Sequence, residues 1–410
     1  MIQKIKNKLQ KRVEARTKDL EIAKEEVEQI LANILLPILI TSKKRRVILY
    51  ANKYAEQQYE KNLDEIIGSG VDSLYTVKGH HQHIRDAIEK YGFIENVEEE
   101  FITSKGKEFT GLLSVKPIMY KNEEAYLGMV TDITKQKKME NEIRENHINI
   151  KRSIQCASLI QSTIIPPEGI MTPFFREHFI TWIPKDTVGG DIWLFNELRD
   201  KDECLLFFID CTGHGVSGAF VTMIVKSIEQ EIVSNIKKHT EFEINPAIIM
   251  SHFNRTMKTL LKQKTKDSLS NVGWDGGIIY YHKKKKILKF AGAETPLFYV
   301  TKDGDFHMIK GDRYSVGYKR CEADYKYKET IIDVESGMKF FCTTDGYLDQ
   351  NGGEKDFPFG KKRFGNIIKE NYKKPMKELQ SVFIQELDKY ESMVENNDRN
   401  DDITLIGFTI

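Results

Sequence analysis

Four aspartates with similar flanking residues form the most informative pattern in this chain. They are Asp191 in VGGDIW, Asp210 in DCTGHGVSGAF, Asp345 in TTDGYLDQ and Asp401 in NDDITLIGF. Carboxylate oxygens are hard ligands that suit Mg²⁺ or Mn²⁺. The first three aspartates are expected to follow apolar strands, and a further strand, ITLIGFTI, is expected just after Asp401. Acids at strand ends beside glycine turns can build a metal site on a rigid sheet, so the four motifs together favour a metal site over unrelated loops.

The same motifs, in the same order, resemble those of a known enzyme family. Residues 165–410 are similar to the metal-dependent protein phosphatases (PPM) of the bacterial SpoIIE-type branch, through GGD, D-x-x-GHG, TDG-x-x-[DE] and DD-I-T. The resemblance implies an α+β fold in which a β-sandwich is flanked by helices. It also implies hydrolysis of phosphoserine or phosphothreonine by a hydroxide that bridges two Mn²⁺ or Mg²⁺ ions.

The resemblance assigns a role to each residue of the metal site. Asp210 would bridge both ions, and the backbone carbonyl of Cys211 would be a further ligand. Asp345 and Asp401 would each hold one ion. Asp191 would orient a metal-bound water or complete the site, so Asp191 and Asp210 are the two residues with an implied catalytic role.

Several neighbouring residues are expected to support this site. Asp402 is expected behind the ligands or as a helper of an additional metal. His214 is either a proton donor or a structural part of its loop, and the resemblance favours the loop. Lys185, six residues before Asp191, is a candidate for contacting the phosphate. The glycines of the second motif are expected to let the backbone turn sharply into a helix; they are Gly213, Gly215 and Gly218.

The chain departs from the family pattern at two places. Many relatives carry an acidic residue three positions after the GGD aspartate, where this chain has Leu194. The usual alanine-glycine-histidine segment is replaced by Ala291, Gly292, Ala293 and Glu294. Neither change affects the four aspartates, so we expect an active enzyme.

Residues 31–133 have the order of elements of a sensor domain. ILLPILITSKKRRVILYANKYAEQQY predicts two strands around a basic turn and then a helix, and EFTGLLSVKPIMY and AYLGMVTDIT predict a hairpin. The segment resembles a PAS domain, including its A-N motif after the second strand. Such a domain can hold a ligand or none, and the sequence leaves the ligand unknown. The histidines of GHHQH, His80, His81 and His83, are expected in an exposed loop and not at a metal or haem.

Helices are predicted on both sides of this domain. Residues 1–30 carry apolar side chains in alternating steps of three and four, which predicts a short coiled coil or, alternatively, one amphipathic helix. Residues 134–164 repeat this spacing and end before Pro166 and Pro167, which cannot continue a helix. We expect a helical signalling linker and a homodimer held by the two helices.

The composition of the chain excludes several classes of protein. A formal net charge of +1 over 410 residues provides no field toward nucleic acid, and residues 283–286, four lysines, are expected at a hairpin turn. No apolar run approaches the roughly 18 residues of a membrane span, and the first residues lack a secretory signal. Five cysteines without C-x-x-C spacing fit a reduced cytoplasmic protein with no disulfide framework or zinc cluster.

The resemblance extends to the class of substrate. It implies a phosphorylated STAS-domain protein, an anti-sigma-factor antagonist, in a partner-switching pathway. An alternative is a catalytically weak signalling scaffold that binds a partner through the same domain. A diguanylate cyclase is disfavoured, because GGD is followed by Ile192 and Trp193 instead of the acid and phenylalanine that those enzymes need.

Overall fold

The computed structural model describes residues 2–76, 82–167, 169–199, 201–239, 241, 243–265, 268–394 and 399–410. The chain divides into two compact units, residues 1–148 and 149–410. Among the described helices, none is both long and apolar enough to cross a membrane. His80 and His81 lie outside the described residues, whereas His83 lies in a helix and not in the expected loop.

The first unit is built on a five-stranded antiparallel sheet in the order β2-β1-β5-β4-β3. Its strands are β1 (Ile38–Ser42), β2 (Ile48–Ala51), β3 (Ile94–Ile102), β4 (Glu108–Tyr120) and β5 (Glu123–Asp132). Its helices are α1 (Ile2–Asn33), α2 (Lys53–Tyr59), α3 (Leu63–Ile66), η1 (Val71–Leu74) and α4 (Gln82–Tyr91). The predicted hairpin is confirmed, and its turn lies at Lys121 and Asn122, which both have positive φ.

Asn52 of the A-N motif joins three parts of this unit. Its Oδ1 accepts hydrogen bonds from the amides of Ile38 and Ala55, both at 3.0 Å, and so caps α2. Its Nδ2 donates to the carbonyl of Leu36 at 2.8 Å, in the segment that follows α1. The side chain therefore fixes the path of the chain from α1 into the sheet.

The helix α5 (Thr134–Ile164) covers the residues for which the spacing predicts a helix. At the start of α5, the amide of Thr134 donates a hydrogen bond to the side chain of Asp132 at 2.8 Å. Two of the regularly spaced apolar side chains, Ile143 and Ile150, remain exposed. On α1 the same holds for Leu9, Val13, Leu20, Val27 and Ile30.

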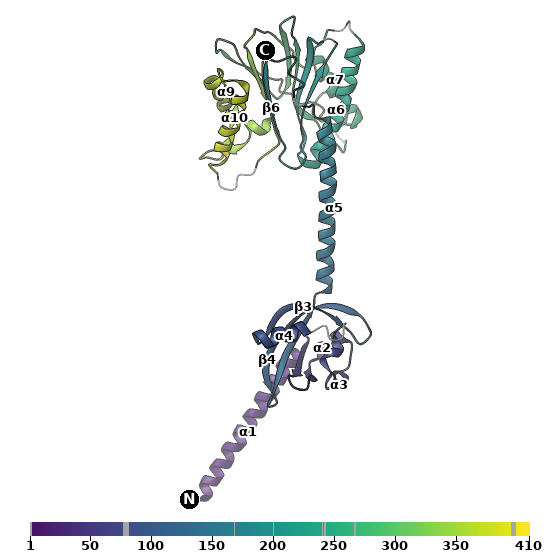
Figure 1. Cartoon of the computed structure of the whole chain (residues 1–410), viewed down its shortest axis with the longest axis vertical. Coiled ribbons are helices and arrows are strands. Elements are labelled where there is room, and N and C mark those ends of the chain that lie inside the picture. Colours follow the sequence, from purple (N-terminus) through teal and green to yellow (C-terminus); the bar gives the residue numbers. More distant parts are fainter. Residues whose placement is uncertain are drawn as a thin grey trace. The chain divides into compact units, whose positions relative to one another are not determined.

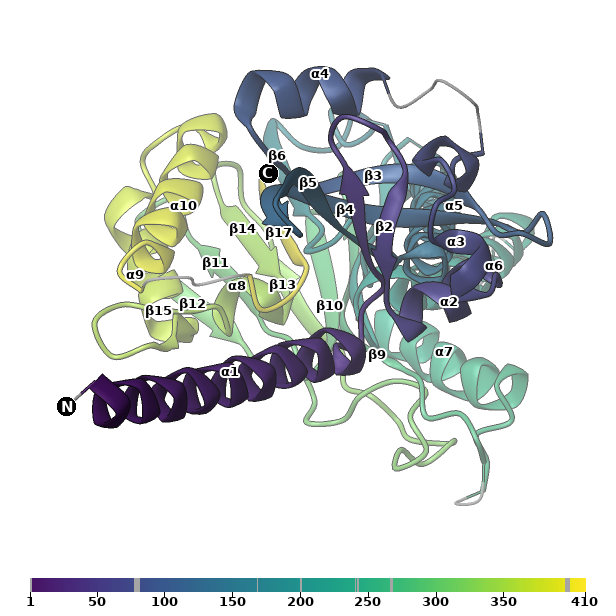
Figure 2. The same ribbon diagram turned by 90° about the horizontal axis from the view of Figure 1, so that it is seen from below.

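The second unit is a sandwich of two five-stranded antiparallel sheets, in the orders β13-β10-β9-β8-β7 and β12-β11-β14-β17-β6. The strands are β6 (Glu177–Ile183), β7 (Asp191–Glu197), β8 (Glu203–Cys211), β9 (Trp274–His282), β10 (Ile287–Ala293), β11 (Leu297–Val300), β12 (Phe306–Ile309), β13 (Thr330–Asp333), β14 (Lys339–Thr343) and β17 (Ile403–Thr409), with a small pair, β15 (Asn351–Gly352) and β16 (Phe357–Pro358). The helices are α6 (Gly215–Lys238), α7 (Pro246–Leu260), α8 (Asp345–Leu348), α9 (Gly360–Asn371) and α10 (Met376–Glu391). Helices α6 and α7 lie on one side of the sandwich and α9 and α10 on the other (Figures 1 and 2).

Both faces of the strands in this unit are buried. Along β8, Leu205, Phe207 and Ile209 belong to the core beneath α6 and α7, and the alternate residues Leu206 and Phe208 belong to the core between the sheets. This explains why LLFFI is a continuous apolar run. The predicted β-sandwich flanked by helices is confirmed, as is the hairpin turn at residues 283–286 between β9 and β10.

Candidate metal centre

The four predicted aspartates come from two different sheets of the second unit. Asp191 and Asp210 lie directly opposite each other on the neighbouring strands β7 and β8. Asp345 is the first residue of α8, immediately after β14, and Asp401 precedes β17. One expectation was wrong: Asp191 begins its strand instead of following one, because the glycines before it form a loop.

Asp191 is held in place by two threonines from the opposite sheet. Its Oδ2 accepts hydrogen bonds from the hydroxyls of Thr344 and Thr404, both at 2.7 Å. Its Oδ1 is buried and has no hydrogen-bond partner among the described residues. Asp191 is 1% exposed, and buried polar atoms are normally satisfied by a partner. A bound cation would satisfy this oxygen.

The acids raise one another's affinity for protons. Burial raises the pKa of Asp191 well above its usual range, against the two threonine hydrogen bonds, and the nearby Asp402 and Asp345 add to this. Burial also raises the pKa of Asp210, and the charges of Asp191, Asp345 and Asp401 act in the same direction. Burial raises the pKa of Asp345 as well, and the charges of Asp349 and Asp401 act in the same direction.

This donor set fits divalent cations. The buried free oxygen of Asp191 and the raised pKa of Asp210, which lies close to other acids, both indicate missing positive charge. No three acidic, histidine or cysteine side chains in the described parts of the chain already stand in a metal-ligating arrangement. Mg²⁺ usually binds through one or two carboxylates and keeps several waters, so a complete protein cage is not required.

The backbone of the second motif contributes oxygens beside the acids. The Cys211 side chain is 2% exposed and lies in the core, so it cannot be the ligand. A Cβ on Gly190 would be 2.7 Å from the Cys211 carbonyl oxygen and 2.3 Å from that of Gly213. Glycine is therefore required at Gly190 for the motif to approach the start of β7.

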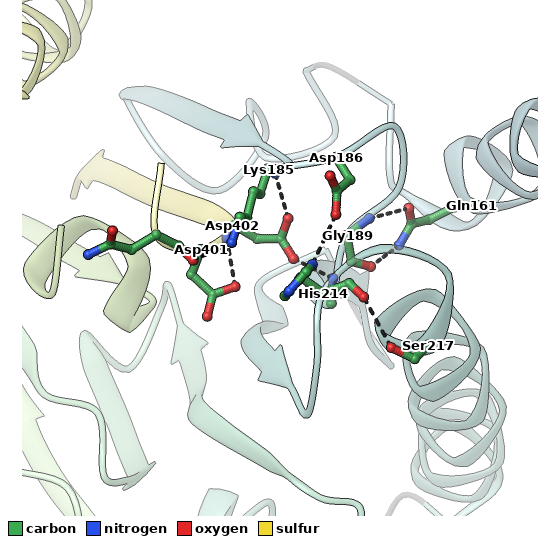
Figure 3. Close-up of polar contacts among 10 residues, drawn as sticks. Gln161, Lys185, Asp186, Gly189, His214, Ser217, Asp401 and Asp402 are labelled. Carbon is green, nitrogen blue, oxygen red and sulfur yellow. Dashed lines mark hydrogen bonds and ion pairs between the residues drawn. The ribbon is translucent and has the colours of Figure 1, made fainter. Parts of the chain in front are cut away.

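Asp402 organises the loop before Asp191. Its Oδ1 accepts from the amide of Lys185 at 2.7 Å and its Oδ2 from the amide of Gly190 at 2.6 Å. It is 2% exposed, which agrees with a place behind the ligands. The Lys185 ammonium donates to the Asn400 carbonyl at 2.9 Å, so in this structure it holds the backbone (Figure 3).

His214 is the N-cap residue of α6. Its ring contacts the carboxylate of Asp186, which the sequence analysis did not include. Its Nδ1 is 2.9 Å from Oδ2 of Asp186, and both side chains are about half exposed. Gly213 and Gly215 have positive φ, which confirms their role in the turn. Gly218 has a different role, because a Cβ there would be 2.6 Å from the Cα of Gly190, so it permits close packing.

Gln161 of α5 contacts the loop that carries the first motif. Its Nε2 donates to the Gly189 carbonyl at 2.6 Å, and its Oε1 accepts from the Gly189 amide at 3.1 Å. Figure 3 shows Gln161 and Gly189 joined by these two bonds, and Gln161 is 2% exposed. Gly189 also lies against Asp402, since a Cβ there would be 2.7 Å from its Oδ1.

Sequence reasoning missed five residues of this region. They are Gln161, Asp186, Asp275, Thr344 and Thr404. The two threonines stand inside the TTDG and DDIT motifs, and Asp275 precedes two glycines in WDGG, so a search for all polar residues beside these turns would have included them. Asp275 lies opposite Asp210 on β9, and burial raises its pKa to about 6.

The first departure from the family pattern has a structural explanation. Leu194 is fully buried on β7, in the core beneath α6 and α7. An acid at this position would lie in the apolar core, so its replacement by leucine favours packing. Glu294, which follows Ala293 in the second departure, has a positive φ of 58°.

Comparison with known proteins identifies two families in this chain. Residues 200–410 match the family model of stage II sporulation protein E (SpoIIE), and residues 35–135 match a PAS domain. The SiaA-PP2C domain of Pseudomonas aeruginosa is 30% identical, with a TM-score of 0.55, and the match covers 65% of this chain and 98% of that one. No curated protein matches the chain in sequence.

Two further solved structures are more distant. One contains the PP2C phosphatase domain and a fragment of the regulatory domain of SpoIIE from Bacillus subtilis, at 12% identity and a TM-score of 0.45, covering 97% of this chain and 90% of that one. The other is RsbX in complex with magnesium, at 16% identity and a TM-score of 0.38, covering 57% and 94%. On the family match and the SiaA-PP2C match, the chain belongs to the SpoIIE family of PP2C-type phosphatase domains and carries a PAS domain ahead of it.

Proposed function

We propose that this protein is a metal-dependent protein serine/threonine phosphatase whose activity is controlled by its PAS domain. The observation that carries the proposal is the convergence of Asp191, Asp210 and Asp345 from two sheets, with one oxygen of Asp191 buried and without a hydrogen-bond partner among the described residues. Two Mg²⁺ or Mn²⁺ ions bound there would activate water and neutralise charge on the phosphoryl oxygens.

Each residue of the site has a defined task in this proposal. Asp210, Asp345, Asp401 and the Cys211 carbonyl hold the ions. Asp191 is orientated by its two threonines and in turn orients water, and Asp402 fixes the loop before it.

His214 keeps two possible roles. With Nδ1 engaged by Asp186, its Nε2 is the ring atom left to hold a proton for the leaving serine or threonine oxygen. The same Asp186 contact also fixes the turn into α6, which is the structural role that the family resemblance favours.

We assign the substrate class from family membership. The substrate is phosphoserine or phosphothreonine on a small STAS-domain protein of a partner-switching pathway in the cytoplasm. The test is phosphate release from such a phosphoprotein by the purified full chain with Mn²⁺, beside p-nitrophenyl phosphate. Hydrolysis of p-nitrophenyl phosphate alone would contradict the substrate class. Binding of the phosphoprotein without turnover of either compound would favour the scaffold alternative.

Regulation is assigned to α5. Its residue Gln161 is hydrogen-bonded to Gly189, two residues before Asp191. The next residue, Gly190, is hydrogen-bonded to Asp402. A shift or rotation of α5 would therefore move the loop that places Asp191. The exposed apolar residues of α1 and α5 need a partner surface, and a second copy of the same helices in a homodimer would supply it.

A further inference from the structure

The first unit contains a cavity of about 300 Å³ between its sheet and its helices. Most of its wall is apolar and includes Leu39, Leu74, Ile84, Phe101, Leu113 and Val130. These side chains are all at least nine-tenths buried. The volume lies at the lower end of the range for small-molecule sites, which begins at roughly 300 Å³.

Gly128 on β5 shows that this space is not ordinary sheet packing. A Cβ on Gly128 would have only two neighbours within 4 Å, the Leu39 carbonyl oxygen at 3.8 Å and Val115 Cγ2 at 4.0 Å. At Gly111 on the adjacent β4, a Cβ would stand 2.6 Å from both Phe101 and Val130. Protein interiors rarely leave voids larger than a water, and an apolar void does not hold water well. The space beside Gly128 therefore suits an apolar occupant.

The cavity also has hydrogen-bond donors that need an acceptor. The Tyr59 hydroxyl is buried and without a hydrogen-bond partner in the described part of the chain. The Nε of Arg85 is also buried, and it too has no hydrogen-bond partner among the described residues. Buried donors in native proteins are almost always satisfied, so these two groups point to a missing acceptor.

The charges on the wall of the cavity favour an anion. Lys43, Arg46 and Arg85 line it, against one carboxylate, that of Glu89. Lys43 is paired with Glu124 at 2.8 Å, which leaves two arginines and one acid. Arginine binds carboxylates through geometrically matched, charge-assisted hydrogen bonds.

We propose that this cavity binds a small carboxylic acid, whose apolar body fills the space beside Gly128 and whose carboxylate accepts from Arg85 and Tyr59. The match to a PAS domain names no ligand, and the phosphatase assignment is not needed for this binding. The proposal therefore specifies the chemical class of the signal that the first unit recognises.

The test is calorimetric titration of the full chain with sodium octanoate and, separately, with octanamide, its neutral analogue. We expect one octanoate per chain and binding of octanamide that is about tenfold weaker. Gly128→Val should abolish binding of both compounds and raise the melting temperature of the first unit, because the new side chain fills the cavity. Arg85→Gln should weaken octanoate about tenfold and leave octanamide unchanged.

Arg45→Gln is the matched control, because Arg45 lies outside the cavity wall and pairs with Glu123 at 2.9 Å on the surface. It should bind octanoate like the original protein. If Gly128→Val does not fold, Arg85→Gln with unchanged circular dichroism carries the test. No binding of octanoate, or equal binding by the original protein and Gly128→Val, would overturn the site. Equal affinities for octanoate and octanamide would overturn the acidic class.

Discussion

The side-chain amide of Gln161 and the peptide group of Gly189 are joined by two hydrogen bonds, of 2.6 and 3.1 Å. Both partners are buried, so neither bond can be exchanged for one to water. Gly189 is followed by Gly190 and Asp191, and the contact therefore links the helix α5 to the start of the strand that carries an acid of the proposed metal centre.

Replacing Gln161 by leucine should lower turnover. Leucine has a similar size but leaves the N–H and C=O of Gly189 buried without partners, at a cost of about 1–3 kcal/mol. The loop would move to find new partners, and we expect the Mn²⁺-dependent rate with p-nitrophenyl phosphate to fall about tenfold. Gln155→Leu, on an exposed position of the same helix, is the control and should leave the rate unchanged.

A second test of the same contact changes the phase of the helix. One to four residues inserted after Glu145 turn the following part of α5 by about 100° each. Activity should vary periodically across the series. Equal activity in all insertions, together with an unaffected Gln161→Leu, would show that α5 only tethers the two units.

Replacing Asp210 or Asp345 by asparagine should abolish activity without unfolding the protein. Each substitution keeps the shape of the side chain but removes a negative charge from the proposed metal centre. The expected loss of several kcal/mol of transition-state stabilisation corresponds to at least about a thousandfold in rate. Turnover of p-nitrophenyl phosphate with Mn²⁺ measures the effect. Asp303→Asn, at the exposed turn between β11 and β12, should retain full activity. A near-normal rate in either variant would refute the assignment of the site.

Thr404→Val should impair the site through Asp191. Valine has the shape of threonine but cannot donate to Oδ2 of Asp191, which then depends on Thr344 alone. Mutation of residues that orient metal ligands typically lowers metal affinity or activity by about 10–100-fold. We expect a rise of about that size in the Mn²⁺ concentration needed for half-maximal activity. The double variant with Thr344→Val should lose more than either single variant, and a normal metal requirement in the double variant would contradict this role.

Asp275→Asn should stabilise the metal-free protein at neutral pH. Burial raises the pKa of Asp275 from 3.8 to about 6, so the folded state binds a proton that the unfolded state has already released. The stability from this group is present at low pH and is lost as the pH rises through about 6.

In EDTA, the asparagine variant should therefore be more stable than the original protein at pH 7.5, by at most about 3 kcal/mol, and equally stable near pH 4. Melting temperatures across this range measure the difference. Asp333→Asn, at an exposed position of β13, should follow the original protein at every pH. A constant difference at all pH values would mean that Asp275 is not buried as a protonated acid.

The full chain should be a homodimer, and residues 165–410 a monomer. The reason is that Leu20 on α1 and Ile150 on α5 are 70% and 60% exposed, although they belong to regularly spaced apolar stripes. Light scattering of the two proteins measures their masses. Leu20→Glu combined with Ile150→Glu should shift the full chain toward monomer. A monomeric full chain at micromolar concentration would contradict the prediction.

The sequence predicted the elements and the acids better than the contacts that organise them. Asp210 and Asp345 could be placed because apolar strands lead into them. Asp191 was put at the wrong end of its strand, since apolar strands lie on both sides of it in the sequence, and β6, the one before it, already ends at Ile183. The role of Gln161 depends on which face of α5 meets the sandwich, and spacing along one helix does not contain that information. The cavity beside Gly128 arises from several strands and helices together, so no local pattern indicates it.

The contact between Thr404 and Asp191 can form only late in the synthesis of the chain. The two residues are 213 positions apart, and Asp401 and Asp402 belong to the same late segment. Nearly all of the sandwich can be synthesised before these groups leave the ribosome. On the proposed assignment, the metal centre therefore cannot be complete until Asp401 and β17 have been made, by which time the residues of the PAS domain have long been synthesised.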